Sequence, residues 1–94
     1  MSFNVEEIRV QFPALKQEVN GRPLVYLDSA ATTQKPQAVI DAIVHYYQHD
    51  NANVHRAAHA LSGRATSAFE DSRRVTAEFL GCANPAQIIW VRGV

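Results

Sequence analysis

The chain lacks the features that mark several classes of protein. Its single cysteine, Cys82, cannot form an internal disulfide, and the turn-forming residues around it indicate a structural thiol. Nine basic side chains balance nine acidic ones, which gives no electrostatic reason to expect a nucleic acid or an anionic membrane as a partner. No apolar run approaches the roughly 18 residues needed to span a bilayer. The N-terminal residues also lack the basic and apolar regions of a secretory signal, so a cytoplasmic location is expected.

The length of 94 residues sets the next limit, because it allows one domain at most. A chain of this size buries only about 60% of its unfolded surface, so modest stability is expected. The sequence has no internal repeat, low-complexity tract or interdomain linker.

Local signals predict the elements of the first half. A capping-box pattern begins at Asn4 and predicts a short helix that Pro13 ends. Asn20-Gly21 is typical of a type I′ turn and predicts a hairpin over residues 16–27, with Pro23 limiting the pairing. The apolar run Leu24–Leu27 is typical of a strand covered on both faces.

Helical spacing of apolar residues predicts two longer helices in the rest of the chain. The first follows Pro36 and runs to about Gln48, and the second begins near Leu61 or Ser62 and ends at Gly81. An ordered loop would join them. On the second helix an ion pair of Glu70 with Arg74 is expected. Finally, a capped turn at Asn84 and an apolar strand over Ile88–Val91 are predicted.

The stretch Asp28–Thr33 stands out because five small residues follow an apolar run. Hydroxyl groups and backbone N–H groups with little side-chain bulk suit a loop that lines a pocket. A plainer interpretation is that Asp28 or Ser29 caps a turn leading into the helix after Pro36. The residues by themselves leave both interpretations open.

With its neighbours, this stretch closely resembles the opening of the pyridoxal-phosphate-dependent cysteine desulfurases, which are class V aminotransferase-like enzymes. The match is specific and runs in order over nearly the whole chain, although only over the first quarter of such enzymes. It is carried by these blocks: Arg9–Pro13 with Val19–Gly21, Tyr26–Ala31 with Gln34–Pro36, Asn53–Arg56, and Val91–Gly93.

The resemblance implies an α/β fold, namely the N-terminal portion of a fold-type I pyridoxal-phosphate-dependent transferase. Residues 1–17 would form an N-terminal arm, and residues 18–94 would begin the large cofactor-binding domain. The parent enzyme would be a homodimer that converts L-cysteine to L-alanine and leaves a persulfide on the enzyme. Similarity to the branch that serves iron–sulphur cluster assembly also implies a sulphur-acceptor protein as partner.

The resemblance also assigns candidate site residues. Those of the substrate pocket are Asp28, Ser29, Ala30, Ala31, His55 and Arg56. Gly93 would begin the turn that holds the cofactor phosphate, although Val94 stands where the family has a threonine. The Schiff-base lysine, the ring-stacking histidine and the sulphur-accepting cysteine of the family match no residue of this chain. We therefore expect the chain by itself to be inactive and to bind no pyridoxal phosphate.

Other functions stay open. Another class V enzyme, such as a selenocysteine lyase, would carry the same motifs. A different possibility is a free-standing interaction or metal-binding module, because His45 and His49, like His55 and His59, are spaced four residues apart. Neither pair encloses a glutamate and no cysteine lies within the cluster, so no metal ligand is assigned. From the residue types, His55 and Arg56 also fit a loop histidine and an arginine paired with a nearby acid.

Overall fold

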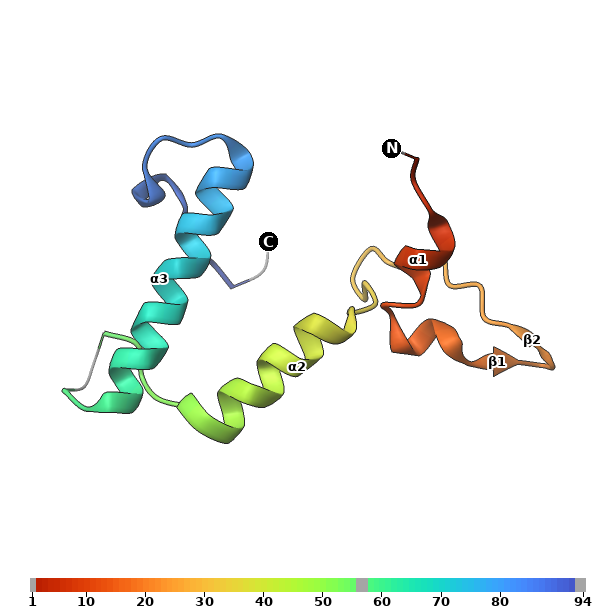
Figure 1. Cartoon of the computed structure of the whole chain (residues 1–94), viewed down its shortest axis with the longest axis horizontal. Coiled ribbons are helices and arrows are strands. Elements are labelled where there is room, and N and C mark those ends of the chain that lie inside the picture. The colour runs from red at the N-terminus through yellow and green to blue at the C-terminus, as the bar shows by residue number, and fades with distance from the viewer. Residues whose placement is uncertain (1, 56–57, 93–94) are drawn as a thin grey trace. The chain divides into compact units, whose positions relative to one another are not determined.

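The computed structural model, drawn in Figure 1, describes residues 2–55 and 58–92. The chain divides into two compact units between His45 and Tyr46. The first unit contains α1 (Val5–Arg9), the 3₁₀ turn η1 (Pro13–Lys16), β1 (Glu18–Val19), β2 (Arg22–Pro23) and α2 (Gln37–His45). The second contains η2 (Tyr46–Asp50), which is a turn of π-helix, then α3 (Ala60–Leu80) and the 3₁₀ turn η3 (Pro85–Gln87).

Helix α1 begins as its capping residue predicts. The Asn4 side chain accepts hydrogen bonds from the backbone N–H groups of Glu6 and Glu7, at 3.0 and 3.2 Å. The helix ends at Arg9, before Pro13, and Pro13 opens η1 instead. The expected short helix is therefore confirmed.

The hairpin is also confirmed, but its strands are short. Asn20 and Gly21 have φ angles of 55° and 76°, as a type I′ turn requires, and Val19 pairs with Arg22 in an antiparallel register. The pairing ends at Pro23, which has no N–H group to donate. One more hydrogen bond, from Leu24 N to Gln17 O at 3.1 Å, extends the contact without extending the strand.

The predicted buried strand over Leu24–Leu27 is wrong. These residues have no regular secondary structure, and Leu27 is 91% exposed. A strand buried on both faces needs neighbours that pair with its backbone and cover its side chains. The described part of the first unit offers only the two-residue strands β1 and β2, so the apolar run has no strand to pair with and Val25 and Leu27 stay exposed.

Hydrogen bonds hold the first unit together. Arg9 Nη2 donates to Leu24 O at 2.6 Å, which ties α1 to the end of the hairpin. The backbone N–H of Gln37 donates to Gln11 O at 2.8 Å, which ties the start of α2 to the turn after α1. Among the described residues of this unit no side chain is fully buried.

Helix α3 organises the second unit. It begins at Ala60, close to the predicted start, and the His59 ring caps it by accepting from Ser62 N at 3.2 Å. It ends at Leu80, and Gly81 follows as the predicted left-handed C′ residue, with φ of 76°. The N–H groups of Gly81 and Cys82 donate to the carbonyls of Glu78 and Ala77, which is the pairing of a Schellman motif.

The core of the described residues is small and lies along α3. Ala65 and Ala77 are each only 2% exposed, and Ser62 and Ile88, the latter just after η3, are buried with them. Ser62 Oγ donates to Asn53 O at 2.7 Å, so its burial leaves no polar group unpaired. The turn η3 has the predicted cap, with Asn84 Oδ1 accepting from Ala86 N at 2.9 Å.

The second predicted strand, Ile88–Val91, is also wrong. This segment has no regular structure, and only Ile88 is buried, whereas Val91 is 76% exposed. The physical reason is the same as for the first run, because no strand of the second unit lies beside it within the described residues. The described fold is thus a small α/β arrangement of helices with one two-stranded hairpin.

No helix in residues 2–55 or 58–92 combines the length and the apolar character needed to cross a membrane.

Candidate functional site

The small-residue stretch forms a compact exposed turn in the first unit. Thr32 Oγ1 donates to Asp28 O at 2.8 Å, and Thr33 Oγ1 donates to Ser29 O at 2.8 Å. The Tyr26 hydroxyl donates to Thr32 O at 3.2 Å and is also hydrogen-bonded to Thr32 Oγ1. These contacts close the turn from one side. Ala30 and Ala31, with only methyl side chains, are exposed at its tip.

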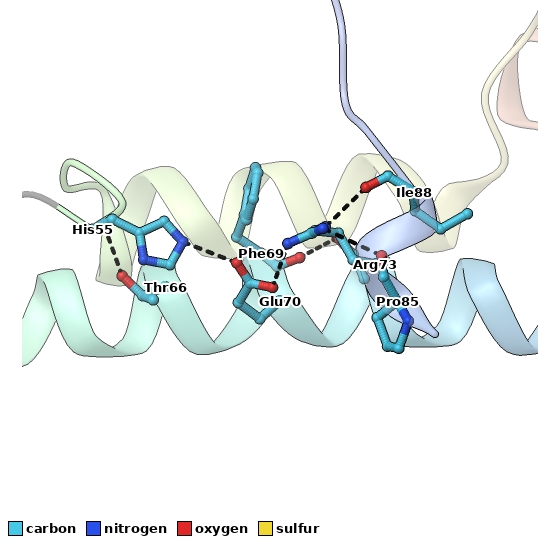
Figure 2. A network of polar contacts seen from close by, with 8 residues as sticks. His55, Thr66, Phe69, Glu70, Arg73, Pro85 and Ile88 are labelled. Carbon is cyan, nitrogen blue, oxygen red and sulfur yellow. Dashed lines mark hydrogen bonds and ion pairs between the residues drawn. The ribbon is translucent and has the colours of Figure 1, made fainter. Parts of the chain in front are cut away.

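His55 lies in the second unit with an unusual backbone. Its φ angle is 60°, in the left-handed region that costs a residue with a side chain about 1–3 kcal/mol. Three contacts hold it there: its N–H donates to Thr66 Oγ1 at 3.0 Å, its Nε2 lies 2.9 Å from Glu70 Oε1, and its ring meets the Phe69 ring edge-on at 6.0 Å. Figure 2 shows these side chains converging from α3 onto His55.

The other oxygen of Glu70 extends this network along α3. Glu70 Oε2 lies 2.9 Å from Arg73 Nη1, while Arg73 Nε and Nη2 donate to the carbonyls of Ile88 and Pro85 at 3.1 and 3.2 Å (Figure 2). The predicted pair of Glu70 with Arg74 is therefore wrong. Arg74 pairs with Glu78 instead, at 2.9 Å, because Glu70 is engaged by His55 and by Arg73.

The predicted pocket residues fall into separate groups. Asp28, Ser29, Ala30 and Ala31 share one turn of the first unit, whereas His55 belongs to the second. Arg56 and Gly93 lie outside the described residues. The role of each in a pocket stays a prediction.

The histidine pairs do not form a metal site in the part of the chain that the structure describes. No group of three or more His, Cys, Asp or Glu side chains there could hold a metal ion. The ring nitrogen Nδ1 of His59 serves as the cap of α3, and Nε2 of His55 faces Glu70.

The lysines do not fit the covalent anchor of a pyridoxal cofactor. Such a lysine acts in a desolvated or positively charged pocket that lowers its pKa. Lys16 and Lys35, the two lysines of the chain, are both exposed, and Lys35 Nζ donates to Thr33 O at 2.6 Å. Within the described residues, neither lysine therefore has the surroundings of a cofactor anchor.

The contacts of Thr66, Phe69 and Glu70 with His55, and of Arg73 with Glu70, were not predicted. Glu70 lies 15 positions after His55 in the sequence, and the loop between them has no period that would set their alignment. The one signal in the sequence that could have pointed to these partners is the row of polar side chains at helical spacing on α3. That row equally fits a solvated helix face.

Comparison with known families identifies the class of protein. Residues 25–94 match the aminotransferase class-V family. This match covers well over half of the chain, and the chain belongs to the aminotransferase class-V family.

Individual relatives narrow this class. The chain is 62% identical over 93 residues to a probable cysteine desulfurase of Vibrio cholerae, covering 99% of this chain and 23% of that protein. It is 53% identical to a cysteine desulfurase of Yersinia pseudotuberculosis, with the same two coverages. A cysteine desulfurase of Synechococcus elongatus is 52% identical, and 15% of it is covered. The chain thus spans less than a quarter of the length of these relatives.

Proposed function

We propose that this chain is the N-terminal portion of a pyridoxal-phosphate-dependent cysteine desulfurase. The observation that carries the proposal is the 62% identity to a probable cysteine desulfurase over 99% of the chain. The whole enzyme transfers the sulphur of L-cysteine to a cysteine thiol of its own. The C–S bond of the substrate breaks, an S–S bond forms in the enzyme persulfide, and L-alanine leaves.

In this proposal the chain contributes the wall of the substrate pocket. The turn of Asp28, Ser29, Ala30 and Ala31 admits a ligand closely because its exposed tip has almost no side-chain bulk. His55 offers a ring nitrogen that can hold or move a proton, and Arg56 offers a two-pronged partner for the substrate carboxylate. The strained backbone of His55 supports a functional role, because strain of this kind clusters at active sites.

Pyridoxal phosphate, when bound in the whole enzyme, supplies the electron sink that makes the C–S bond labile. Gly93 is the residue of this chain proposed to approach the cofactor phosphate through its backbone N–H. The lysine that anchors the cofactor and the cysteine that accepts the sulphur would come from the remainder of the enzyme.

Several finer features belong to the same proposal. Residues 1–17 form an arm, and residues 18–94 begin the large domain of a fold-type I transferase. There the runs Leu24–Leu27 and Ile88–Val91 become strands of a larger sheet. The 91% and 76% exposure of Leu27 and Val91 supports this. The enzyme acts as a homodimer in the cytoplasm and passes its sulphur to an acceptor protein for iron–sulphur cluster assembly.

The test is the release of L-alanine from L-cysteine by the whole gene product that contains the chain. The protein is purified with pyridoxal phosphate, and alanine is quantified with and without a reductant that clears the persulfide. Catalytic alanine release in the presence of reductant is expected. Absence of alanine from a correctly folded, cofactor-loaded protein would refute the proposal.

A selenocysteine lyase is the alternative within the family, and the same assay separates the two. Alanine release from L-selenocysteine but not from L-cysteine would favour the lyase. Comparable release from both substrates, with a persulfide detected on the protein, would favour the desulfurase.

A further inference from the structure

Glu70 joins two parts of the second unit that are distant in sequence. Its Oε1 faces Nε2 of His55 at 2.9 Å, and its Oε2 faces Nη1 of Arg73 at 2.9 Å. Arg73 in turn binds the carbonyls of Pro85 and Ile88. Figure 2 shows the chain of contacts running along one side of α3, from the His55 loop to the segment beyond η3.

The chemistry of the carboxylate fixes the His55 ring in one tautomer. An ionised carboxylate accepts hydrogen bonds and donates none, so the contact at Oε1 requires the proton to be on Nε2. The neutral ring then presents Nδ1 as an acceptor. The edge-on contact with Phe69 at 6.0 Å restricts rotation of the ring, and the bond from the His55 backbone N–H to Thr66 fixes the backbone that carries it.

Both oxygens of Glu70 are needed for this arrangement. The Arg73 guanidinium has only donors, so the group facing it must be an acceptor. A glutamine at position 70 has one acceptor oxygen, which Arg73 would take, and its NH₂ group would then face His55. His55 could accept a hydrogen bond from that NH₂ group only through an unprotonated Nε2. The proton of the neutral ring would then be on Nδ1.

The pair is too exposed to matter chiefly for stability. The side chains of His55 and Glu70 are 53% and 40% exposed, and a polar contact this open to water contributes little to the free energy of folding. Carboxylates beside functional histidines commonly fix the tautomer and the orientation of the ring. A contact that does this while adding little stability suits a positioning role.

We propose that Glu70 is a positioning residue: it holds His55 with Nε2 protonated and Nδ1 free to accept, and through Arg73 it couples this ring to the Pro85–Ile88 segment. The inference rests on the proposed function in so far as His55 acts in the substrate pocket. The coupling itself is a property of the second unit and is measurable without activity.

The test uses the whole gene product with three variants. Glu70→Gln removes one acceptor. Arg73→Lys keeps the charge beside Glu70 but loses the fork that binds two carbonyls. Glu78→Gln is the matched control, because Glu78 pairs with Arg74 on the same helix at the same 2.9 Å, and the Arg74 and Glu78 side chains are 52% and 66% exposed.

Two readouts report on structure. Nitrogen-15 NMR of labelled histidine, at about pH 8 where imidazole groups are generally neutral, shows which ring nitrogen carries the proton. Hydrogen exchange reports on the amides of His55 and Ile88. We expect Glu70→Gln to move the proton of His55 to Nδ1. Because a neutral amide oxygen binds Arg73 more weakly than a carboxylate does, it should also speed exchange at both amides about threefold to tenfold. Arg73→Lys should speed exchange at Ile88 only, and Glu78→Gln should change neither readout.

Alanine release is the third readout and separates the two proposals. Where the wild type is active, Glu70→Gln should lower kcat about tenfold, as loss of an outer partner of a functional histidine does, with Glu78→Gln unchanged. An inactive wild type refutes the proposed function and leaves the NMR and exchange results to decide the coupling. The positioning role is overturned if Glu70→Gln leaves the His55 tautomer and the exchange rate of the His55 amide the same as in Glu78→Gln. It is also overturned if Glu70→Gln speeds exchange uniformly along α3.

Discussion

Helix α3 contains Gly63, and Gly81 caps its C-terminal end. Replacing Gly63 by alanine should stabilise the helix, whereas replacing Gly81 by alanine should destabilise it. Gly81 has φ of 76°, and a Cβ built there meets nothing within 4 Å. Gly63 lies in the first turns of α3 with a φ outside the left-handed region, and a Cβ there also meets nothing within 4 Å. An added methyl group therefore makes no steric clash at either position, and the backbone conformation alone decides the effect of each substitution on stability.

The magnitudes follow from that conformation. An alanine forced into the left-handed region costs about 1–2 kcal/mol, so Gly81→Ala should destabilise the last turn by about 1 kcal/mol after the smaller entropy of unfolded alanine is allowed for. Alanine in a helix is favoured over glycine by about 0.5–1 kcal/mol, so Gly63→Ala should stabilise the first half of α3. One kcal/mol corresponds to about a fivefold change in a local opening equilibrium.

Hydrogen exchange resolved along α3 is the assay, because it measures local opening at each end of the helix. Gly81→Ala should speed exchange around Ala77, and Gly63→Ala should slow exchange from about Ser67 onward. Equal effects of the two variants, or faster exchange in Gly63→Ala, would refute the assigned backbone conformations. The same helix carries every side chain that holds His55, so its register matters to the proposed site.

Three further predictions concern the loop and the isolated chain. Thr66→Val should speed exchange of the His55 amide about threefold, because its acceptor at 3.0 Å is lost, whereas Thr66→Ser should not; equal rates in both variants would contradict the contact. The 94-residue chain should leave the absorbance spectrum of added pyridoxal phosphate unchanged, and a new band abolished by replacing Lys16 or Lys35 would overturn this. The same chain should self-associate on sedimentation or stay loosely packed and bind a hydrophobic dye, because so many large apolar side chains are exposed; a monomeric, dye-free, two-state domain would contradict that and favour an independent module.

Local signals in the sequence predicted the ends and turns of elements well. The caps at Asn4 and Asn84, the turn at Asn20-Gly21 and the left-handed residue Gly81 are all confirmed. Each depends on a side chain and the backbone within a few residues of it, so the sequence contains the whole cause.

The strand predictions failed because their cause is not local. Leu24–Leu27 and Ile88–Val91 have the composition of buried strands, but a strand forms only where another pairs with it. Within the described residues no such partner is available to either run. The composition is instead what a strand in a larger sheet would need.

The candidate site was predicted only in part for a similar reason. The motif at His55 was recognised from its residues, but its partners on α3 were not, and Glu70 was paired with Arg74 by the usual helical spacing. Helical spacing makes both neighbours reachable from Glu70. The tertiary contacts of Arg73 with Pro85 and Ile88 decide between them.

The most direct test of the central claim is the mass and sequence of the natural gene product that contains this chain. The account predicts a protein several times longer than 94 residues, in which a lysine outside this chain binds pyridoxal phosphate covalently and can be recovered as a reduced cofactor–lysine peptide. A natural product that ends at Val94, or a longer one whose reduced cofactor peptide is never found, would contradict the claim that the chain is part of a cysteine desulfurase.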